Sequence, residues 1–331
     1  ESDARFVFDA LNVKGSGELT LQEMRSILAM GGEVSTVNRN ALKRASAYGQ
    51  GGLGNFAIET NAVFDQSATQ EQVYEQCAAP LVEDVLRGRS ATLFAYGQSG
   101  AGKTYNLYGP DEVMLDVASA PANKRGIVPH ACDEIFAGIA ARPELQGAVV
   151  TCSYLEIYNE RLNGLLKGGQ DLRLRESHAR GVFVEGLARP EASNTQQLCD
   201  IISKGNNARE TKAKEEGRKQ GHAVFIIEVT TSATAEGSGK VGQLYCVDLM
   251  SSENVKRADA KEAASGGGGA FGGDKKASGG KKSEADRKKV EESHFINKSL
   301  AVLGTCIQKL TAKRDKSGRT FVPYRDSKLT R

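Results

Sequence analysis

The spacing of apolar residues predicts a strand in one part of this 331-residue chain and a helix in another. Residues 91–96 (ATLFAY) form an apolar, β-prone run, which is typical of a buried strand. Near the C-terminal end, apolar residues recur at helical spacing over residues 294–310, which predicts a helix with one buried stripe. That stripe consists of Ile296, Leu300, Leu303, Ile307 and Leu310.

The composition favours a soluble α/β protein with a large core. Hydrophobic residues make up 39% of the chain and charged residues 26%, which is ordinary for that class. The six cysteines are far apart and form no CxxC pair, so reduced thiols and a cytosolic setting are expected. The four histidines lack metal-ligand spacing, and no apolar run is long enough to span a membrane. A net charge of +3 is too small to indicate nucleic acid. Neither a membrane nor a nucleic acid is therefore an expected partner.

A glycine-rich motif follows the predicted strand directly. Residues 97–104 (GQSGAGKT) match the pattern GxxxxGK(S/T), whose consecutive backbone N–H groups wrap a phosphate chain. In such a loop Lys103 would reach the β- and γ-phosphates, and the Thr104 hydroxyl would bind Mg²⁺. The alternative is a coincidental glycine-rich turn, but the strand in front favours the loop. The predicted nucleotide-binding site comprises Gln98, Ser99, Gly100, Ala101, Gly102, Lys103 and Thr104.

The flanks of this loop resemble one family. Residues 94–105 (FAYGQSGAGKTY) are similar to the phosphate-binding loop of kinesin motor domains, and the resemblance extends over roughly residues 34–331. It implies a P-loop fold with a central, mostly parallel sheet and helices on both faces, and it implies microtubules as the partner. Further kinesin-like segments follow in the order of the family: residues 153–160 (SYLEIYNE), 222–225 (HAVF), 247–249 (VDL), 296–300 (INKSL) and 322–331 (VPYRDSKLTR).

The first switch motif of the family, NxxSSRSH, is altered in this chain. Residues 215–222 read EEGRKQGH, so Arg218 and Lys219 replace the serines that position the attacking water and bind Mg²⁺ in the family. Shifting the alignment by one residue does not restore the hydroxyls. Two unit charges 4 Å apart repel by about 4 kcal/mol at an effective dielectric constant of 20. Lys219 is therefore expected to point away from the metal, or the loop to leave the metal.

The second switch motif, DLAGSE in the family, reads DLMSSE over residues 248–253. The resemblance implies that Asp248, together with Thr104, holds Mg²⁺ through the nucleotide. Ser251 replaces the glycine whose N–H swings onto the γ-phosphate, and it restricts that motion. Glu253 is retained, but Gln220 replaces its arginine partner, so the salt bridge that closes the switches is missing. Because such groups contribute about 10²–10³ in rate each, the set Lys219, Gln220, Ser251 and Glu253 predicts little hydrolysis.

The face that would meet the filament contains an insertion and a helix. Residues 254–293 are longer than the corresponding loop of the family and rich in glycine and basic residues, which predicts an extended flexible loop. This segment would tether acidic tubulin, or it would be a solvated linker with balancing acids. By resemblance the helix over residues 294–310 is the main microtubule-binding helix. The expected interface residues are Lys298, Lys309, Lys313, Arg325 and Lys328.

The N-terminal segment does not belong to the motor pattern. Residues 1–32 resemble a degenerate EF-hand, with Gly17 and Glu23 at loop positions 6 and 12. Asn12 and Lys14 stand where Ca²⁺ requires carboxylates, so calcium binding is not expected. The segment is predicted to be a helix-loop-helix ahead of a kinesin-like domain over residues 33–331. The chain begins with Glu1 rather than Met, which suggests a fragment of a longer protein.

The motifs predict a kinesin-like protein that binds microtubules but hydrolyses ATP poorly, with a structural or regulatory role. One alternative is an active ATP-driven motor that tolerates the substitutions, so the status as an enzyme stays open. Another is a nucleotide-sensing module that has also lost tubulin binding. The expected location is the cytoplasm, on the microtubule cytoskeleton, with the ciliary axoneme as one candidate array. Other cytoskeletal proteins are further candidate partners.

Overall fold

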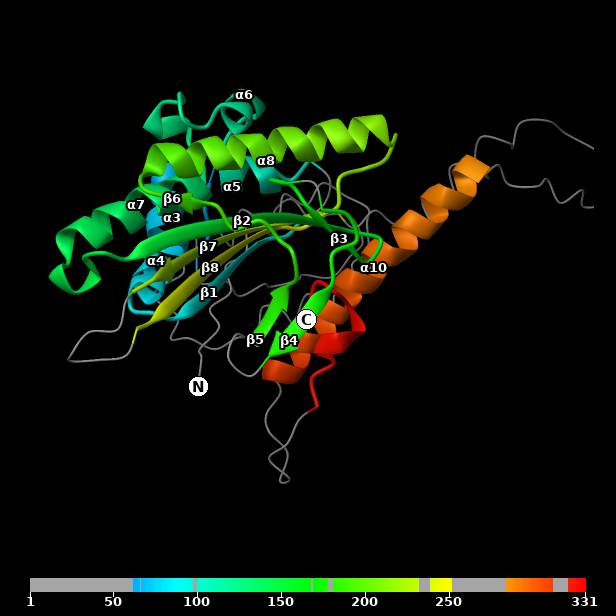
Figure 1. Ribbon diagram of the computed structural model, residues 1–331. Coiled ribbons are helices and arrows are strands. Elements are labelled where there is room, and N and C mark those ends of the chain that lie inside the picture. The colour runs from blue at the N-terminus through cyan, green and yellow to red at the C-terminus, as the bar shows by residue number, and fades with distance from the viewer. Residues whose placement is uncertain are drawn as a thin grey trace, which may run out of the picture.

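The protein forms an α/β structure around a six-stranded sheet, with a small two-stranded sheet beside it (Figure 1). The computed structural model describes residues 62–65, 67–97, 100–167, 169–177, 181–231, 239–251, 284–311 and 321–331. Among them, the strands of the large sheet are β1 (Ser90–Ala95), β2 (Val149–Tyr158), β3 (Arg161–Gly164), β6 (Glu191–Ala192), β7 (His222–Thr230) and β8 (Val241–Asp248). The small sheet pairs β4 (Leu174–Ser177) with β5 (Gly181–Val184).

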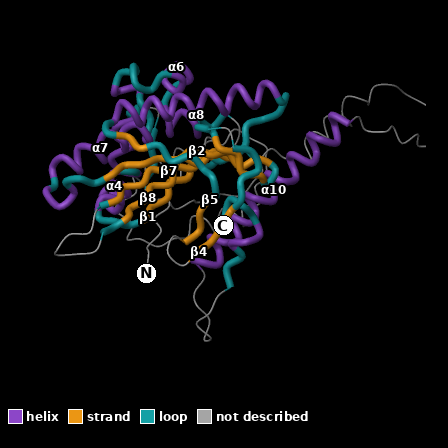
Figure 2. The backbone as a smooth tube through the Cα atoms, in the orientation of Figure 1, coloured by secondary structure: helices purple, strands orange, loops and turns teal. Residues whose placement is uncertain are grey.

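Helices cover both faces of the large sheet, as predicted (Figure 2). The strand expected at residues 91–96 is β1, one residue displaced. The helices are α3 (Gln70–Cys77), α4 (Ala79–Leu86), α5 (Lys103–Tyr108), α6 (Asp111–Leu115), α7 (Ile127–Ala141), α8 (Thr195–Glu215) and α10 (Glu284–Thr311), with short 3-10 turns η1 (Ala122–Lys124), η2 (Pro143–Leu145) and η3 (Tyr324–Asp326). Among the described residues, no helix is long and apolar enough to cross a membrane.

The large sheet is mixed rather than mostly parallel. Its strand order is β1-β8-β7-β2-β3, and among the described pairings β1 with β8 is parallel while the others are antiparallel. The reason lies in the connections. Only two residues join β2 to β3, and residues 231–240 join β7 to β8, whereas a parallel crossover needs a dozen residues or more. The prediction of a mostly parallel sheet was therefore wrong for this part of the chain.

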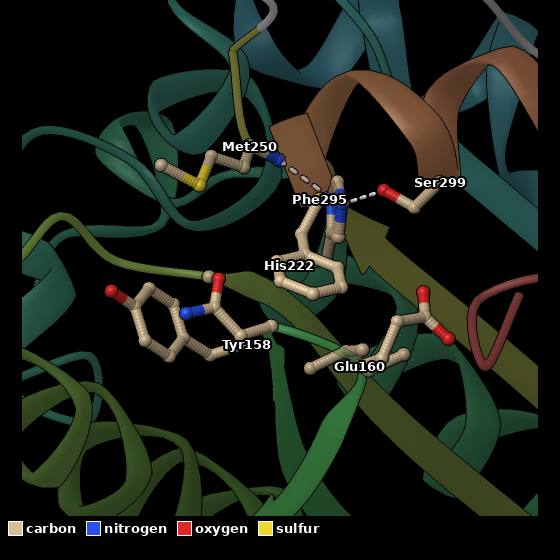
Figure 3. A pocket seen from close by; sticks show the side chains of 9 residues that line it. Tyr158, Glu160, His222, Met250, Phe295 and Ser299 are labelled. Carbon is tan, nitrogen blue, oxygen red and sulfur yellow. Dashed lines mark hydrogen bonds between the residues drawn. The ribbon is translucent and has the colours of Figure 1, made fainter. Parts of the chain in front are cut away.

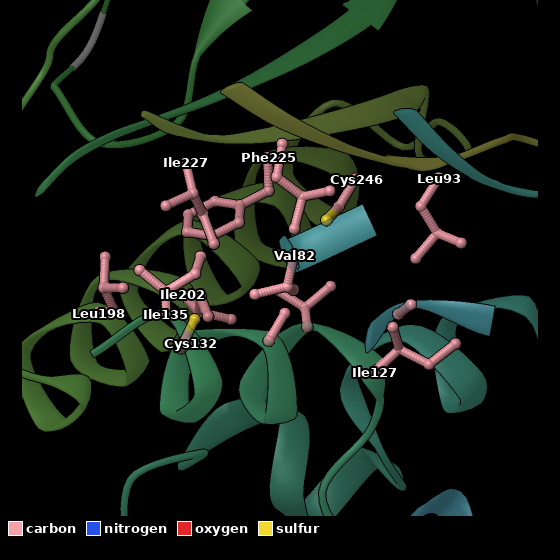
Figure 4. Close-up of a cluster of buried hydrophobic side chains, with 14 of the residues drawn as sticks. Val82, Leu93, Ile127, Cys132, Ile135, Leu198, Ile202, Phe225, Ile227 and Cys246 are labelled. Carbon is pink, nitrogen blue, oxygen red and sulfur yellow. The ribbon is translucent and has the colours of Figure 1, made fainter. Parts of the chain in front are cut away.

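Alternate side chains of the strands enter two cores, one on each face. Tyr154 of β2 and Phe225 of β7 belong to the larger core, together with residues of α4, α7 and α8. Figure 4 shows Phe225 in this core. The neighbouring residues Leu155 and Val224 point to the opposite face, where Leu300 of α10 packs against them. This period of two is what a sheet buried on both sides requires. It places α8 and α10 on opposite faces, with the ends of β7 and β8 between them.

Helix α10 begins earlier than its apolar pattern indicated, at Glu284. The described part of the expected loop, residues 284–293, is therefore helical. The buried stripe also differs from the prediction: Leu310 is 48% exposed, whereas Ser299 and Cys306 are buried beside Ile307. Leu310 lies in the last turn of α10, where the helix extends past the core. Residues 1–32 and 254–283 lie outside the described residues.

The turn between β2 and β3 connects the sheet to the C-terminal segment. Asn159 and Glu160 have φ angles of 49° and 57°, the left-handed conformation that a two-residue hairpin turn requires at both positions. This conformation is unfavourable for glutamate. The Glu160 carboxylate offsets the cost by accepting hydrogen bonds from the Ser327 hydroxyl at 2.9 Å and from the Lys328 N–H at 2.8 Å.

Candidate nucleotide-binding site

The glycine-rich motif forms the connection from β1 to α5. Gly100 and Gly102 have φ angles of 78° and 81°, in the left-handed region that glycine adopts without a steric penalty. Helix α5 begins at Lys103, so the side chains of Lys103 and Thr104 project from its first turn. Gln98 and Ser99 lie outside the described residues.

Lys103 is buried, with 8% of its surface exposed. Its ammonium donates hydrogen bonds to the carbonyl oxygen of Gly97 at 3.0 Å and to the hydroxyl oxygen of Ser251 at 2.9 Å. Burial lowers the pKa of Lys103; the negative charge of Asp248 opposes this shift, and the positive charge of Arg209 adds to it. The lysine of the motif is thus held in place by oxygens from two different segments.

Thr104 and Asp248, the predicted magnesium ligands, lie together. The parallel pairing of β1 with β8 sets Ala95 opposite Asp248, at the edge of the sheet where the glycine-rich loop begins. The Thr104 hydroxyl donates to Oδ2 of Asp248 at 2.9 Å. Hydroxyl and carboxylate oxygens are the ligands that Mg²⁺ prefers in proteins. The pair therefore fits the metal ion of a nucleotide complex.

Arg209 is a site residue that the motifs did not reveal. It projects from α8 and donates from Nη1 to the same Oδ2 of Asp248 at 2.8 Å, with side-chain exposures of 6% and 3%. Its Nη2 donates to the carbonyl oxygen of Gly221 at 2.6 Å. Burial acts to lower the pKa of Arg209, but Asp248 and Tyr154 together raise it above its ordinary value. Its helical spacing from Ile202 and Gly205 could have indicated that Arg209 lies on the buried face of α8.

The altered first switch is attached to the sheet through Arg218. Its Nη1 and Nη2 donate to Oε1 and Oε2 of Glu156 at 2.9 and 2.7 Å, and its guanidinium lies 4.1 Å from the centre of the Tyr158 ring. Arg218 also contacts Glu216 through Nε. Gly221 adds a backbone N–H to Glu156 Oε1 at 2.7 Å. The cation at the position of a family serine therefore points into the protein.

The ionisation of this pair follows from its contacts. Glu156 has no exposed side-chain surface, and that of Arg218 is 6% exposed. Burial alone would raise the pKa of Glu156, but the hydrogen bonds from Arg218 and Gly221 lower it below its ordinary value. Likewise burial acts against the charge of Arg218, while Glu156 and Glu216 raise the pKa of Arg218. Both groups are charged at neutral pH.

The other altered switch positions have different surroundings. Lys219 is exposed, and Gln220 is half-buried. Ser251 is the last described residue of the second switch, and Glu253 lies outside the described residues. The missing pair of Glu253 with residue 220 stays a prediction.

His222 links the two switches to α10 (Figure 3). The N–H of Met250 donates to Nδ1 at 2.9 Å, so Nε2 carries the proton and donates to the Ser299 hydroxyl at 2.8 Å. Burial and, to a smaller extent, the positive charge of Arg209 together lower the pKa of His222 to about 4. A small pocket beside this histidine is lined by residues that include Tyr158, Glu160 and Phe295. It opens between the switches and α10, away from the glycine-rich loop.

The predicted interface residues occupy α10 and the C-terminal segment. Lys298 and Lys309 are exposed on α10, Arg325 is exposed in η3, and Lys328 is half-buried. Helix α10 packs against η3, which brings these two groups onto one side of the molecule. Arg325 donates to Glu176 of β4 at 2.9 Å. Lys313 lies outside the described residues.

These observations define a class of protein first. A buried lysine and a threonine at the start of the helix after β1, with an aspartate at the end of the adjacent strand, are the arrangement of P-loop nucleotide-binding proteins. Comparison with known proteins narrows the class to one family. The family profile described as "Kinesin motor domain" matches residues 28–267 and 275–331. The chain belongs to the kinesin motor-domain family.

The relatives agree with this assignment. "Kinesin heavy chain" of Botryotinia fuckeliana is 35% identical over 285 residues, which are 85% of this chain and 28% of the relative. "Kinesin-like protein KIF3C" of Mus musculus is 37% identical over 281 residues, or 82% of this chain and 33% of the relative. The chain thus spans about a third or less of the length of these relatives.

Solved structures show the same fold. One, described as "Structure of a fast kinesin: Implications for ATPase mechanism and interactions with microtubules", has a TM-score of 0.65 and 33% identity, covering 84% of this chain and 69% of that chain. The motor domain of the Kar3-like kinesin from Ashbya gossypii has a TM-score of 0.58 and 26% identity, covering 82% and 70%. The family and the motor-domain fold expected from the motifs are confirmed, with a mixed rather than a mostly parallel sheet.

Proposed function

We propose that this chain is a microtubule-binding kinesin-like domain that binds ATP or ADP with Mg²⁺ and hydrolyses ATP poorly, as a structural or regulatory element of the cytoskeleton. Nucleotide would be held by the glycine-rich loop, including Gln98 to Thr104, with Mg²⁺ between Thr104 and Asp248. The close placement of Lys103, Thr104 and Asp248 supports this binding. The protein would act in the cytoplasm on a microtubule array.

One observation carries the proposal of poor hydrolysis. Arg218, in the place of a family serine, is bound to Glu156 inside the protein rather than facing the site. Residues 216–222 (EGRKQGH) contain no hydroxyl side chain that could take over. Without a hydroxyl, the first switch lacks the side-chain group that binds Mg²⁺ and positions the attacking water in the family. Preorganised groups of this kind account for about 10²–10³ in rate each.

Microtubule binding is supported by the exposed basic residues and by one relative. The solved fast kinesin is described in terms of its interactions with microtubules. In this chain Lys298, Lys309 and Arg325 are exposed on the side formed by α10 and η3. A cluster of exposed cations suits the acidic surface of tubulin.

An active motor is the second candidate, and a specific observation favours it. The Lys103–Gly97 and Thr104–Asp248 hydrogen bonds hold the lysine, the threonine and the aspartate of the motifs where a working nucleotide site needs them. If Arg218 left Glu156 during a catalytic cycle, the first switch could adopt a second position. A nucleotide-sensing module without tubulin binding is the third candidate.

Two measurements on the same sample separate the three candidates. Steady-state phosphate release, with and without microtubules, should stay far below the roughly 1–100 s⁻¹ typical of kinases. Co-sedimentation should show the chain bound to microtubules. Strong stimulation by microtubules would establish the active motor, and failure to co-sediment would favour the sensing module. A Lys103→Ala variant gives the background rate of phosphate release.

A further inference from the structure

Ser251 makes a contact that glycine, the family residue at this position, cannot make. Its hydroxyl oxygen accepts a hydrogen bond from the ammonium of Lys103 at 2.9 Å. Ser251 is half-buried and follows the end of β8 by three residues. The same ammonium donates to the carbonyl oxygen of Gly97 at 3.0 Å. Two of its three hydrogens are therefore directed at oxygens of the protein.

The Ser251 hydroxyl lies between the backbone of residue 251 and the Lys103 ammonium. A serine Oγ is attached through one carbon to its own backbone, so it lies close to the N–H of residue 251. The Ser251 side chain thus fills the space between that backbone and the Lys103 ammonium. In a P-loop site, the lysine reaches both the β- and the γ-phosphate. An oxygen that contacts both Lys103 and the backbone of residue 251 must take the place of the hydroxyl.

The two phosphates differ in this respect. Contact of Lys103 with a β-phosphate, in the cradle of the glycine-rich loop, does not require the backbone of residue 251. Contact of Lys103 with a γ-phosphate at the second switch, in contrast, does require the backbone of residue 251. Lys103 is nine-tenths buried, so an exchange of its partners is not compensated by water. The charge of Asp248, already shared by Thr104 and Arg209, faces the same ammonium.

We propose that Ser251 makes this site selective for a nucleoside diphosphate over a nucleoside triphosphate, because its hydroxyl gives Lys103 the oxygen contact that a γ-phosphate would otherwise provide. The inference rests on the proposed nucleotide binding. It makes Ser251 a specificity-determining residue rather than only a missing glycine. The chain would then remain in its diphosphate state at most nucleotide ratios.

Calorimetric titration with ADP and with the non-hydrolysable triphosphate AMP-PNP, each with Mg²⁺, tests the proposal without any turnover. The unmodified chain should bind ADP about tenfold more tightly than AMP-PNP, equivalent to about 1.4 kcal/mol. Ser251→Ala removes the hydroxyl and leaves the backbone as restricted as before. It should bring the two affinities to within about threefold, chiefly by strengthening AMP-PNP. Ser251→Gly should do the same.

The control is Ser119→Ala, the same chemical change at an exposed serine outside the site, which should leave the ratio unchanged. Thermal unfolding of each variant establishes that it is folded. Equal affinities in the unmodified chain would overturn the selectivity. A weaker AMP-PNP complex in Ser251→Ala would overturn it as well, and would show that the hydroxyl is a ligand for the γ-phosphate. No binding of either nucleotide would instead refute the proposed function, and the inference with it.

Discussion

Glu156 and Arg218 form a two-pronged ion pair at the centre of the altered switch, with N–O distances of 2.9 and 2.7 Å. Glu156 belongs to β2, whereas Arg218 lies in the connection between α8 and β7, 62 residues away in sequence. Because Gly221 also donates to Glu156, the connection is attached to the sheet at two points. The first switch is thereby joined to β2, a strand with neighbours on both sides in the large sheet.

Removal of Arg218 should destabilise the fold strongly. Arg218→Ala leaves the Glu156 carboxylate buried without its charge partner, which costs about 3–5 kcal/mol in comparable pairs. Arg218→Lys keeps the charge but loses the two-pronged geometry, so its loss should be smaller. Denaturant unfolding measures both effects.

The matched control for this prediction is an exposed pair. Arg175 and Glu185 join β4 to the end of β5 at 3.0 Å with side-chain exposures of 49% and 54%. Arg175→Ala should therefore change the free energy of unfolding by less than about 1 kcal/mol. An Arg218→Ala loss as small as that of Arg175→Ala would mean that the buried pair does not hold the switch.

Acid should destabilise the protein through His222. Its pKa is lowered to about 4 in the fold from an ordinary value of 6.5, so the unfolded chain binds the proton first. The contribution is complete above pH 6.5 and is lost as the pH falls towards 4, by about 3 kcal/mol in total. The lowered pKa of Glu156 acts in the same direction at lower pH. Unfolding free energies across this range, compared with those of His222→Gln, would measure the effect; a pH dependence unchanged in the variant would contradict it.

Repair of the switch residues should be cooperative. Lys219→Ser, Gln220→Arg and Ser251→Gly restore three family groups that act on the same γ-phosphate and water. The triple variant should gain more phosphate release, with microtubules present, than the single changes predict, because catalytic groups act as a unit. Additive or absent gains would show that the defect lies elsewhere, for example in the attachment of Arg218 to Glu156.

Charge reversal on α10 should weaken microtubule binding. Lys298→Glu and Lys309→Glu are each expected to raise the dissociation constant in co-sedimentation by about fivefold, the scale of an exposed ion pair, and the effect should shrink at high salt. Lys124→Glu changes an equally exposed lysine in η1, on a different part of the molecule, and should have no effect. A similar loss in all three variants would indicate non-specific attraction rather than a docking face.

The sequence was sufficient to predict those site residues that belong to a contiguous motif. Lys103 and Thr104 lie within one loop, and Asp248 ends an apolar strand, so their meeting followed from resemblance and is seen in the structure. Arg209 and Glu156 could not be found in that way, since each depends on a partner from another element. The mixed sheet likewise depends on the short β2–β3 and β7–β8 connections and on the pairing of β2 with the distant β7, which a pattern of single strands does not contain.

Arg218 illustrates the same limit from the opposite side. From the aligned motif alone, Arg218 is predicted to place a positive charge beside the metal ion, which would repel it. In the folded chain its guanidinium finds Glu156 and the Tyr158 ring instead. Likewise Leu310 fits the apolar stripe of α10 but is exposed, because it lies in the last turn of the helix, beyond the buried residues Cys306 and Ile307. Local pattern predicts which face is apolar, whereas the extent of a core is a property of the whole fold.

The main chain around Gly221 leaves no room for a side chain. A side chain at this position, where the family has serine, would overlap the main-chain oxygen of Ile157. Regaining serine would require β2 to move, and β2 is paired with β7 along nine residues. A serine at this position is therefore opposed mainly by the main chain of Ile157, with Cβ of Tyr158 also only 3.0 Å away. Restoring the family serine at residue 221 is therefore expected to require a shift of the β2 main chain in addition to the substitution itself.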